Sequence, residues 1–146
     1  YREYREDVLN SLPSLGLELG NDIVLLGTVD DAEFPEWFHA ADGCAFPSVN
    51  EGWGLVILEA ASAGLPVVAS DIDVFKEFLV DGKDAVLTRV GDPQSLAAGM
   101  SALLDNSALV RRLALNGPHL AARYQWSQTA AQHIGVYDGL NLQRST

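Results

Sequence analysis

Two acidic residues stand eight positions apart in a segment that also holds two glycines and a tryptophan. Glu51 lies directly before Gly52-Trp53-Gly54, and Glu59 follows inside an apolar run. Ionised carboxylates accept hydrogen bonds from hydroxyl groups but repel phosphate, so this pair suits the hydroxyls of a sugar or a ribose. Eight residues of pure helix would rotate one acid from the other by about 80°. Loop geometry at Glu51 must therefore bring both acids to one ligand.

The two glycines indicate a seat for a phosphate group. They stand just before residues 55–63, which are rich in helix-forming side chains. Glycine permits a positive φ and a close approach of ligand to backbone, and the first turn of a helix carries N–H groups that favour phosphate oxygens. Gly52 and Gly54 are therefore expected at a helix entrance that can face an anion.

Structural roles compete with these functional ones. A loop acid at Glu51 would stabilise a nearby helix N-terminus by about 0.3–1 kcal/mol through the helix dipole. Glu59 can be read as a solvated surface acid, although its apolar neighbours favour a packed setting in which an acid needs a partner. Trp53 is equally compatible with a hydrophobic plug and with a ligand contact. Gly64 is expected to end the helix as a C-cap.

The elements that must position this segment alternate between strand and helix. Asp92-Pro93 and Asp105-Asn106-Ser107 are start signals for two late helices. This alternation predicts an α/β fold with a Rossmann-like parallel sheet, helices on both faces, and ligands bound beyond the carboxyl ends of the strands. We expect helices over residues 1–12, 33–41, 55–63, 74–79, 94–104, 108–123 and 127–140, and strands over residues 23–26, 44–46, 67–69 and 85–87.

The chain resembles the family 4 retaining glycosyltransferases, which have the GT-B fold. The resemblance rests on Pro47-Ser48-Val49-Asn50-Glu51-Gly52-Trp53-Gly54-Leu55, on Glu59-Ala60 and on Gly64-Leu65-Pro66-Val67-Val68. It implies that residues 1–146 form a single, partial nucleotide-sugar-binding domain, the C-terminal GT-B domain lacking its first strands. The N-terminal acceptor domain of the same protein is expected as a missing partner.

This resemblance implies transfer of a sugar from a nucleoside diphosphate sugar to an acceptor, with retention of anomeric configuration. Glu51 would be the catalytic residue and hold donor-sugar hydroxyls, and Glu59 would hold the ribose hydroxyls. Backbone amides would stabilise charge on the leaving diphosphate. These donor-binding amides are those around Gly52, Trp53, Gly54 and Leu55.

Further expectations concern the base pocket and the cofactors. By resemblance Thr28 and Val29 face the nucleotide base, although a turn at the end of a strand explains them equally well. No metal and no cofactor is expected, since the nucleotide sugar is a co-substrate. The family meets the pyrophosphate with a basic loop that resembles nothing in this sequence, so the isolated chain is expected to be inactive. The alternative is a non-catalytic nucleotide-binding or interaction module of the same fold.

Charge and composition restrict the partners. The formal net charge is −11, with eleven acids and no Lys or Arg between Pro13 and Phe75. This balance argues against nucleic acid and anionic membrane surfaces. The lone Cys44 excludes an intrachain disulfide, and we expect a cytoplasmic location. An exposed sheet edge favours self-association. Aromatic residues at helical spacing are expected in the core: Trp37, Phe38, Trp126 and Tyr137.

Overall fold

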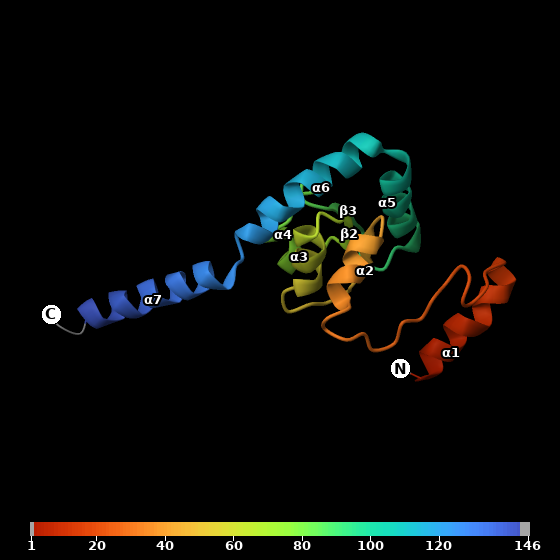
Figure 1. The fold of residues 1–146 in the computed structure, drawn as a ribbon, viewed down its shortest axis with the longest axis horizontal. Coiled ribbons are helices and arrows are strands. Elements are labelled where there is room, and N and C mark those ends of the chain that lie inside the picture. Colours follow the sequence, from red (N-terminus) through yellow and green to blue (C-terminus); the bar gives the residue numbers. More distant parts are fainter. Residues whose placement is uncertain (1, 144–146) are drawn as a thin grey trace. The chain divides into compact units, whose positions relative to one another are not determined.

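The computed structural model describes residues 2–143, and the side chains of residues 5–140. Its chain divides into two compact units, Tyr1–Phe34 and Pro35–Thr146. The first unit contains α1 (Arg2–Ser11) and the 3-10 helix η1 (Leu12–Leu15), followed by a long connecting segment (Figure 1). The helix expected over residues 1–12 is confirmed for Arg2–Ser11, and residue 1 lies outside the described residues.

The prediction of a strand over residues 23–26 is wrong. Ile23 makes one isolated bridge, to Leu19, and the side chains of Val24 and Leu25 are 62% and 47% exposed. An apolar run becomes a stable strand only where neighbouring strands satisfy its backbone groups and an apolar face covers its side chains. The described residues of the first unit supply neither a neighbouring strand nor an apolar cover. The apolar run alone therefore does not form a strand.

The second unit holds the sheet and the remaining helices. The expected helices and three of the four expected strands are confirmed here, with small shifts at their ends. The elements are α2 (Phe34–Ala40), β1 (Cys44–Phe46), α3 (Leu55–Ser62), β2 (Val67–Ser70), α4 (Asp73–Lys76), β3 (Val86–Thr88), α5 (Pro93–Asp105), α6 (Ser107–Ala122) and α7 (Trp126–Gln143).

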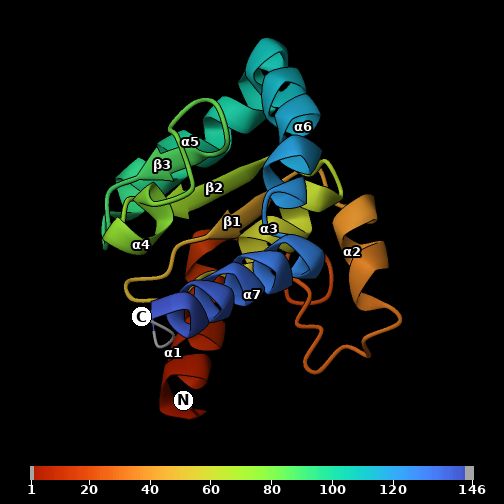
Figure 2. The ribbon, with the colours of Figure 1, turned by 90° about the vertical axis from the view of Figure 1, so that its left-hand side faces the viewer.

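The three strands are parallel and lie in the order β1-β2-β3 (Figure 2). All residues of the central strand β2 are buried, because both of its faces are covered. Val67 and Ala69 belong to the core cluster with Ile57 of α3. Val68 faces Gly99 of α5. A Cβ placed on Gly99 would lie 2.9 Å from the Cγ1 atom of Val68. The α/β class with helices on both faces is therefore confirmed.

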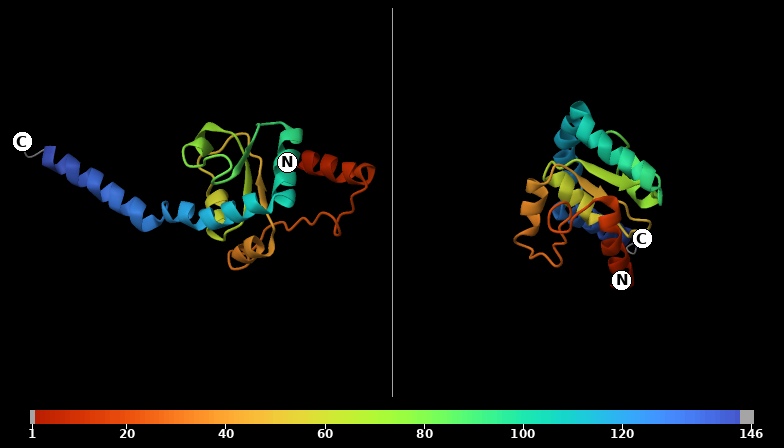
Figure 3. Two further views of the ribbon diagram at one scale, coloured as in Figure 1. Left: turned by 90° about the horizontal axis from the view of Figure 1, so that it is seen from above. Right: turned by 90° about the vertical axis from the view of Figure 1, so that its right-hand side faces the viewer.

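Two helix start signals work as the sequence predicts. The Asp92 carboxylate accepts a hydrogen bond from the Ser95 N–H, and this bond, with Arg89 close by, lowers the pKa of Asp92. The Asn106 Oδ1 atom accepts from the Leu109 N–H at 3.0 Å and caps α6. α6 then packs along α3, as Figure 3 shows from above.

We expect Asn106→Ala to lower the free energy of unfolding by about 1 kcal/mol, the usual loss for a removed N-cap. The physical cause is that the Leu109 N–H loses the Asn106 Oδ1 atom as its acceptor. Urea denaturation measures the change, with exposed Ser101→Ala in α5 as control. Equal stabilities of the two variants would contradict a capping role.

Three of the four aromatic residues expected in the core lie at the surface. Trp126 is 85% exposed and Tyr137 is 63% exposed, both on α7, and Trp37 is also exposed. Phe38 packs against the core. Helical spacing predicts that aromatic side chains share a face, but it does not show that another element covers this face.

Candidate functional site

Gly54 shapes the entrance to α3. It is the N-cap of this helix with φ +93°, a conformation that residues with a side chain rarely adopt. A Cβ on Gly54 would also lie 2.6 Å from the Phe75 ring, which is completely buried. Gly52 has no positive φ, and a Cβ there would meet no atom within 4 Å. Gly54 is thus required by the fold, while Gly52 opens onto free space.

The first turn of α3 leaves a row of N–H groups without partners. Its first backbone bond runs from the Ile57 N–H to the Gly54 carbonyl at 3.0 Å. Within the described chain no hydrogen bond uses the N–H groups of Gly52, Trp53, Gly54, Leu55 and Val56. Such unpaired donors, at the positive end of a helix, favour an anionic oxygen.

Glu51 is held in the loop before these amides. Its Oε1 atom accepts a hydrogen bond from the Ser48 hydroxyl at 2.7 Å, and the pair is partly buried. One carboxylate oxygen is therefore anchored, while the second is left for other partners. This bond and the turn at Gly54 fix the loop conformation around Glu51.

A hollow of about 390 Å³ opens beside Glu51, and its charged lining is acidic. Glu51, Asp71 and Asp73 all line it. Lys76 forms ion pairs with Asp71 at 3.1 Å and with Asp73 at 3.5 Å, and the hydrogen bond to Asp71 chiefly raises the pKa of Lys76. Lys76, which contacts two of the lining acids, is thus already engaged by carboxylates.

Glu59 faces a different hollow. It lies on the exposed side of α3 and lines a cavity of about 830 Å³ together with Trp53, Tyr124 and Trp126. The polar residues Ser62 and Gln125 also line it. This surface combines aromatic faces with hydrogen-bonding groups, which suits a ligand with both apolar rings and hydroxyls.

Trp53 has a clear packing role. Its ring stacks on Phe78 with centroids 5.1 Å apart and meets the edge of Tyr124 at 5.4 Å. The three rings join the loop, the segment after α4 and the end of α6. Trp53 also lines the Glu59 hollow. The same side chain therefore packs in the core and is available to a ligand.

Residues 3–106 match the family described as glycosyl transferases group 1. This chain belongs to that family. The domain is 41% identical over 117 residues to a phosphatidyl-myo-inositol mannosyltransferase of Mycobacterium leprae, a match that covers 80% of this chain and 31% of the relative. This group 1 glycosyltransferase domain therefore spans about a third of the length of that relative.

Solved structures place the group 1 glycosyltransferase domain in the GT-B fold as a C-terminal domain. The C-terminal domain of a group 1 glycosyl transferase from Francisella tularensis matches with a TM-score of 0.76 and 27% identity, over 85% of this chain and 64% of that one. Anabaena HepE, solved with UDP and glucose, matches with a TM-score of 0.82 and 28% identity, over 94% of this chain and 37% of that one.

The group 1 glycosyltransferase domain brings some of the predicted site residues together and separates others. Glu51 and the amides of the helix entrance are contiguous, but Glu59 lines a hollow that does not include Glu51. A ligand that contacts both acids must extend across both hollows. Thr28 and Val29 lie in the first unit, where Thr28 is exposed and Val29 is half-buried.

Sequence reasoning missed Ser48 as the anchor of Glu51 and Tyr124 as a wall of the Glu59 hollow. A hydroxyl three residues before a loop acid is a detectable signal for the first, because side chains at this separation form local hydrogen bonds. Tyr124 is distant in sequence, so no local signal identifies it.

Three further features of this group 1 glycosyltransferase domain concern metal binding, its thiol and membrane-spanning helices. Within residues 2–143 no group of three His, Cys, Asp or Glu side chains could hold a metal ion. Cys44 is a free thiol, and burial raises its pKa, which disfavours the reactive thiolate. None of the described helices is long and apolar enough to cross a membrane.

Proposed function

We propose that this chain is the donor-binding part of a retaining glycosyltransferase that transfers a sugar from a nucleoside diphosphate sugar to an acceptor. The observation that carries this proposal is the row of unpaired N–H groups at the entrance of α3, directly after an anchored Glu51. Such donors stabilise the charge that develops on a departing diphosphate. The family and the UDP complex of the HepE structure support the same reading.

The two carboxylates take different parts of the donor. Glu51, the proposed catalytic residue, would accept hydrogen bonds from donor-sugar hydroxyls through the oxygen that Ser48 does not hold. Glu59 would accept from the ribose hydroxyls, and the aromatic wall of its hollow would cover an apolar ring face. Thr28 and Val29 would lie beside the base. The diphosphate would bridge the two hollows at the amides of the helix entrance.

The isolated chain is proposed to be inactive. The charged groups around the Glu51 hollow are acids and a lysine already paired with them, so the pyrophosphate would find no free cation among these residues. By resemblance, the basic side chains would come from a loop of the C-terminal domain that resembles nothing in this sequence, and the acceptor site would come from the N-terminal domain of the same protein. We place the protein in the cytoplasm, with a nucleotide sugar and an acceptor as partners and without a role for nucleic acid, a metal or a cofactor.

Titration calorimetry of this chain with UDP, GDP and ADP tests the donor site. Glu59→Ala is expected to weaken binding of the preferred nucleotide about ten- to one-hundred-fold, because a hydrogen bond to a charged group contributes about 1.5–3 kcal/mol. Glu59→Gln keeps one oxygen acceptor and should lose less. The matched control is Glu77→Ala, which removes an exposed acid that lines neither hollow.

The outcomes separate an incomplete site from a wrong assignment. Affinity weaker than about 1 mM for all three nucleotides, or about −4 kcal/mol, would mean that the chain alone lacks a working donor site, as the missing basic side chains predict. An equal loss in Glu59→Ala and Glu77→Ala would mean that nucleotides respond to net charge alone.

The carboxylates of the Glu51 hollow disfavour the negative charge that develops on a leaving diphosphate, which supports a second candidate function without sugar transfer. With Asp71 and Asp73 beside the proposed phosphate seat, this domain could serve as a non-catalytic nucleotide-binding or interaction module. Nucleotide binding without any preference for a nucleotide sugar over the free diphosphate would support this module.

A further inference from the structure

Charge is strongly segregated along this chain. Residues 106–137 contain no Asp or Glu, although the whole sequence holds 20 of them. The same stretch contains Arg111, Arg112 and Arg123, which are three of the nine Lys and Arg residues. A molecule with a net charge of −11 therefore has a long segment of positive charge, whose arginines lie on α6 and at its C-cap Arg123.

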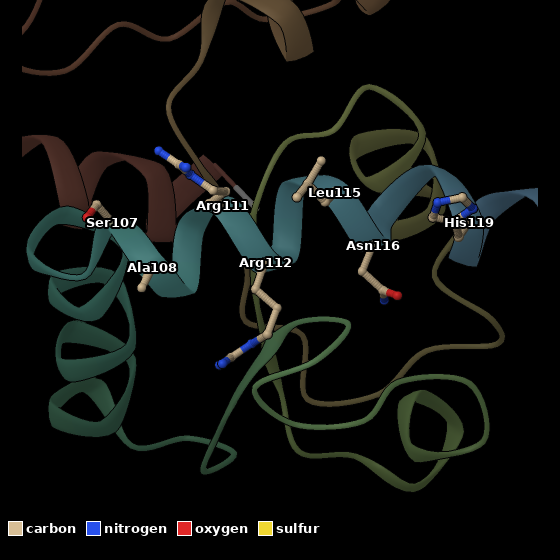
Figure 4. A pocket seen from close by; sticks show the side chains of 7 residues that line it. All are labelled: Ser107, Ala108, Arg111, Arg112, Leu115, Asn116 and His119. Atoms are coloured by element: carbon tan, nitrogen blue, oxygen red, sulfur yellow. The ribbon is translucent and has the colours of Figure 1, made fainter.

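The basic side chains of α6 lie on its exposed side. Arg111, Arg112 and His119 line a wide, open hollow along the helix together with Leu115, which is 68% exposed (Figure 4). Figure 4 shows Arg111 and Arg112 projecting to opposite sides of the helix, with Leu115 following them along it. We call these four residues the α6 surface.

The charges of the α6 surface are not neutralised by ion pairs within the described chain. The Arg112 Nε atom donates to the Gly82 carbonyl at 2.7 Å, which holds the guanidinium in place without removing its charge. Arg111 has no ion pair among the described residues. The neighbouring acid Asp84 is buried and accepts from the Val80 N–H and from Asn116, so it is already satisfied.

This geometry selects the partner. A single phosphate is clamped by donors that converge on it, whereas Arg111 and Arg112 diverge. Diverging cations fit an anion that extends over a surface. Exposed Leu115, about one turn along α6 from the two arginines, adds an apolar contact that a nucleic-acid backbone does not use but a lipid interface does. We propose that the α6 surface docks on the phosphate headgroups of an anionic lipid bilayer.

The net charge of −11 by itself argues against anionic membrane surfaces, and it restricts how the α6 surface can meet one. All acids of the sequence lie outside residues 106–137, so the rest of the molecule is repelled by an anionic bilayer. Only an orientation with the α6 surface toward the lipid is attractive. Binding is therefore weak, oriented and strongly dependent on salt. The proposal is independent of the donor site, which uses residues of α3 and its loop.

Vesicle co-sedimentation of the full chain tests this proposal. Vesicles contain phosphatidylcholine alone or mixed with phosphatidylglycerol, each at low and at physiological salt. We expect binding to the mixed vesicles only, and a loss of about 25-fold in the partition coefficient for the double variant Arg111→Gln/Arg112→Gln. Arg111→Gln alone, which breaks no described contact, should lose about five-fold. Leu115→Ser should also weaken binding at unchanged charge.

The charge-matched control is Arg5→Gln/Arg89→Gln, which removes two exposed cations outside α6 and should leave binding within about two-fold of the original. Circular dichroism checks that each variant is folded. Equal loss in both double variants, or binding to neutral vesicles, would overturn the proposal. So would saturable binding of inorganic pyrophosphate that needs Arg111 in the absence of vesicle binding, since the ligand would then be a small anion. Binding to RNA but not to vesicles would likewise overturn it.

Discussion

Gly117→Ala should destabilise this domain by about 3 kcal/mol or more, at the upper end of the usual overpacking range. Gly117 lies where α6 crosses α3. A Cβ at this position would lie 2.5 Å from the Ala61 carbonyl oxygen and 3.2 Å from two further backbone atoms of the same residue. These atoms belong to a helix backbone and not to the flexible end of a side chain. The new methyl group is therefore accommodated only if one helix moves.

Urea denaturation followed by circular dichroism measures this loss, and the chain offers a matched control. Gly135→Ala makes the same chemical change inside helix α7, where a Cβ would meet no atom within 4 Å. There the better helix propensity of alanine should leave the free energy of unfolding unchanged or raise it by up to about 1 kcal/mol. Similar effects of the two substitutions would show that α3 and α6 are not closely packed.

Movement of α3 in Gly117→Ala should also change nucleotide affinity. The helix entrance at Gly54 and the side chain of Glu59 both belong to α3 or its cap. Gly117→Ala is therefore expected to weaken nucleotide binding even at temperatures where the variant is still folded. An affinity that does not change in the folded variant would mean that α3 keeps its position and that α6 yields.

Glu51→Gln is expected to reduce kcat/KM about 100- to 1,000-fold in a polypeptide that joins this domain to its acceptor domain, the loss typical of removing one transition-state contact. Glutamine keeps the size of the side chain but removes the negative charge. Ser48→Ala removes the hydroxyl that holds Oε1 and should cost less, because the carboxylate is retained but less well oriented. Glu77→Gln is the control for a change of charge elsewhere.

Binding data separate a catalytic role of Glu51 from a structural one. A free nucleoside diphosphate lacks the donor sugar, so Glu51→Gln should bind it as well as the original chain does. The advantage of the nucleotide sugar over the free diphosphate should disappear. If Glu51→Gln instead weakens both ligands and lowers the melting temperature, Glu51 acts mainly by shaping the loop through Ser48.

Local sequence patterns predict most of the second unit because its elements have local causes. Asp92 and Asn106 cap their helices with side-chain bonds to N–H groups three residues later, which a sequence motif specifies. Gly64 follows the C-cap Ala63 of α3 and has φ +73°, the left-handed conformation in which glycine commonly ends a helix. In contrast, residues 23–26 needed strand partners distant in sequence, and their apolar character could not reveal that these partners are lacking among the described residues.

The candidate site follows the same division. The sequence motif located the turn at Gly54 and the acids on either side of it, since both lie within one loop and one helix. It did not predict that Glu51 and Glu59 line separate hollows, because the wall formed by Tyr124 and Trp126 comes from a distant helix end. The acidic setting was partly visible in the sequence at Asp71 and Asp73, whereas their pairing with Lys76 depends on how the chain folds.

Phe75 ties the candidate site to the folding equilibrium of the domain. Its buried ring lies 6.0 Å from the ring of Phe46 on β1 and also occupies the space that a side chain on Gly54 would need. The conformation of the helix entrance is therefore set when the core forms, before any donor binds. Donor binding then does not include the entropic cost of ordering this segment. Core substitutions at Phe75 should consequently change donor affinity along with stability, so thermostability would be a selectable proxy for donor affinity in variants of this domain.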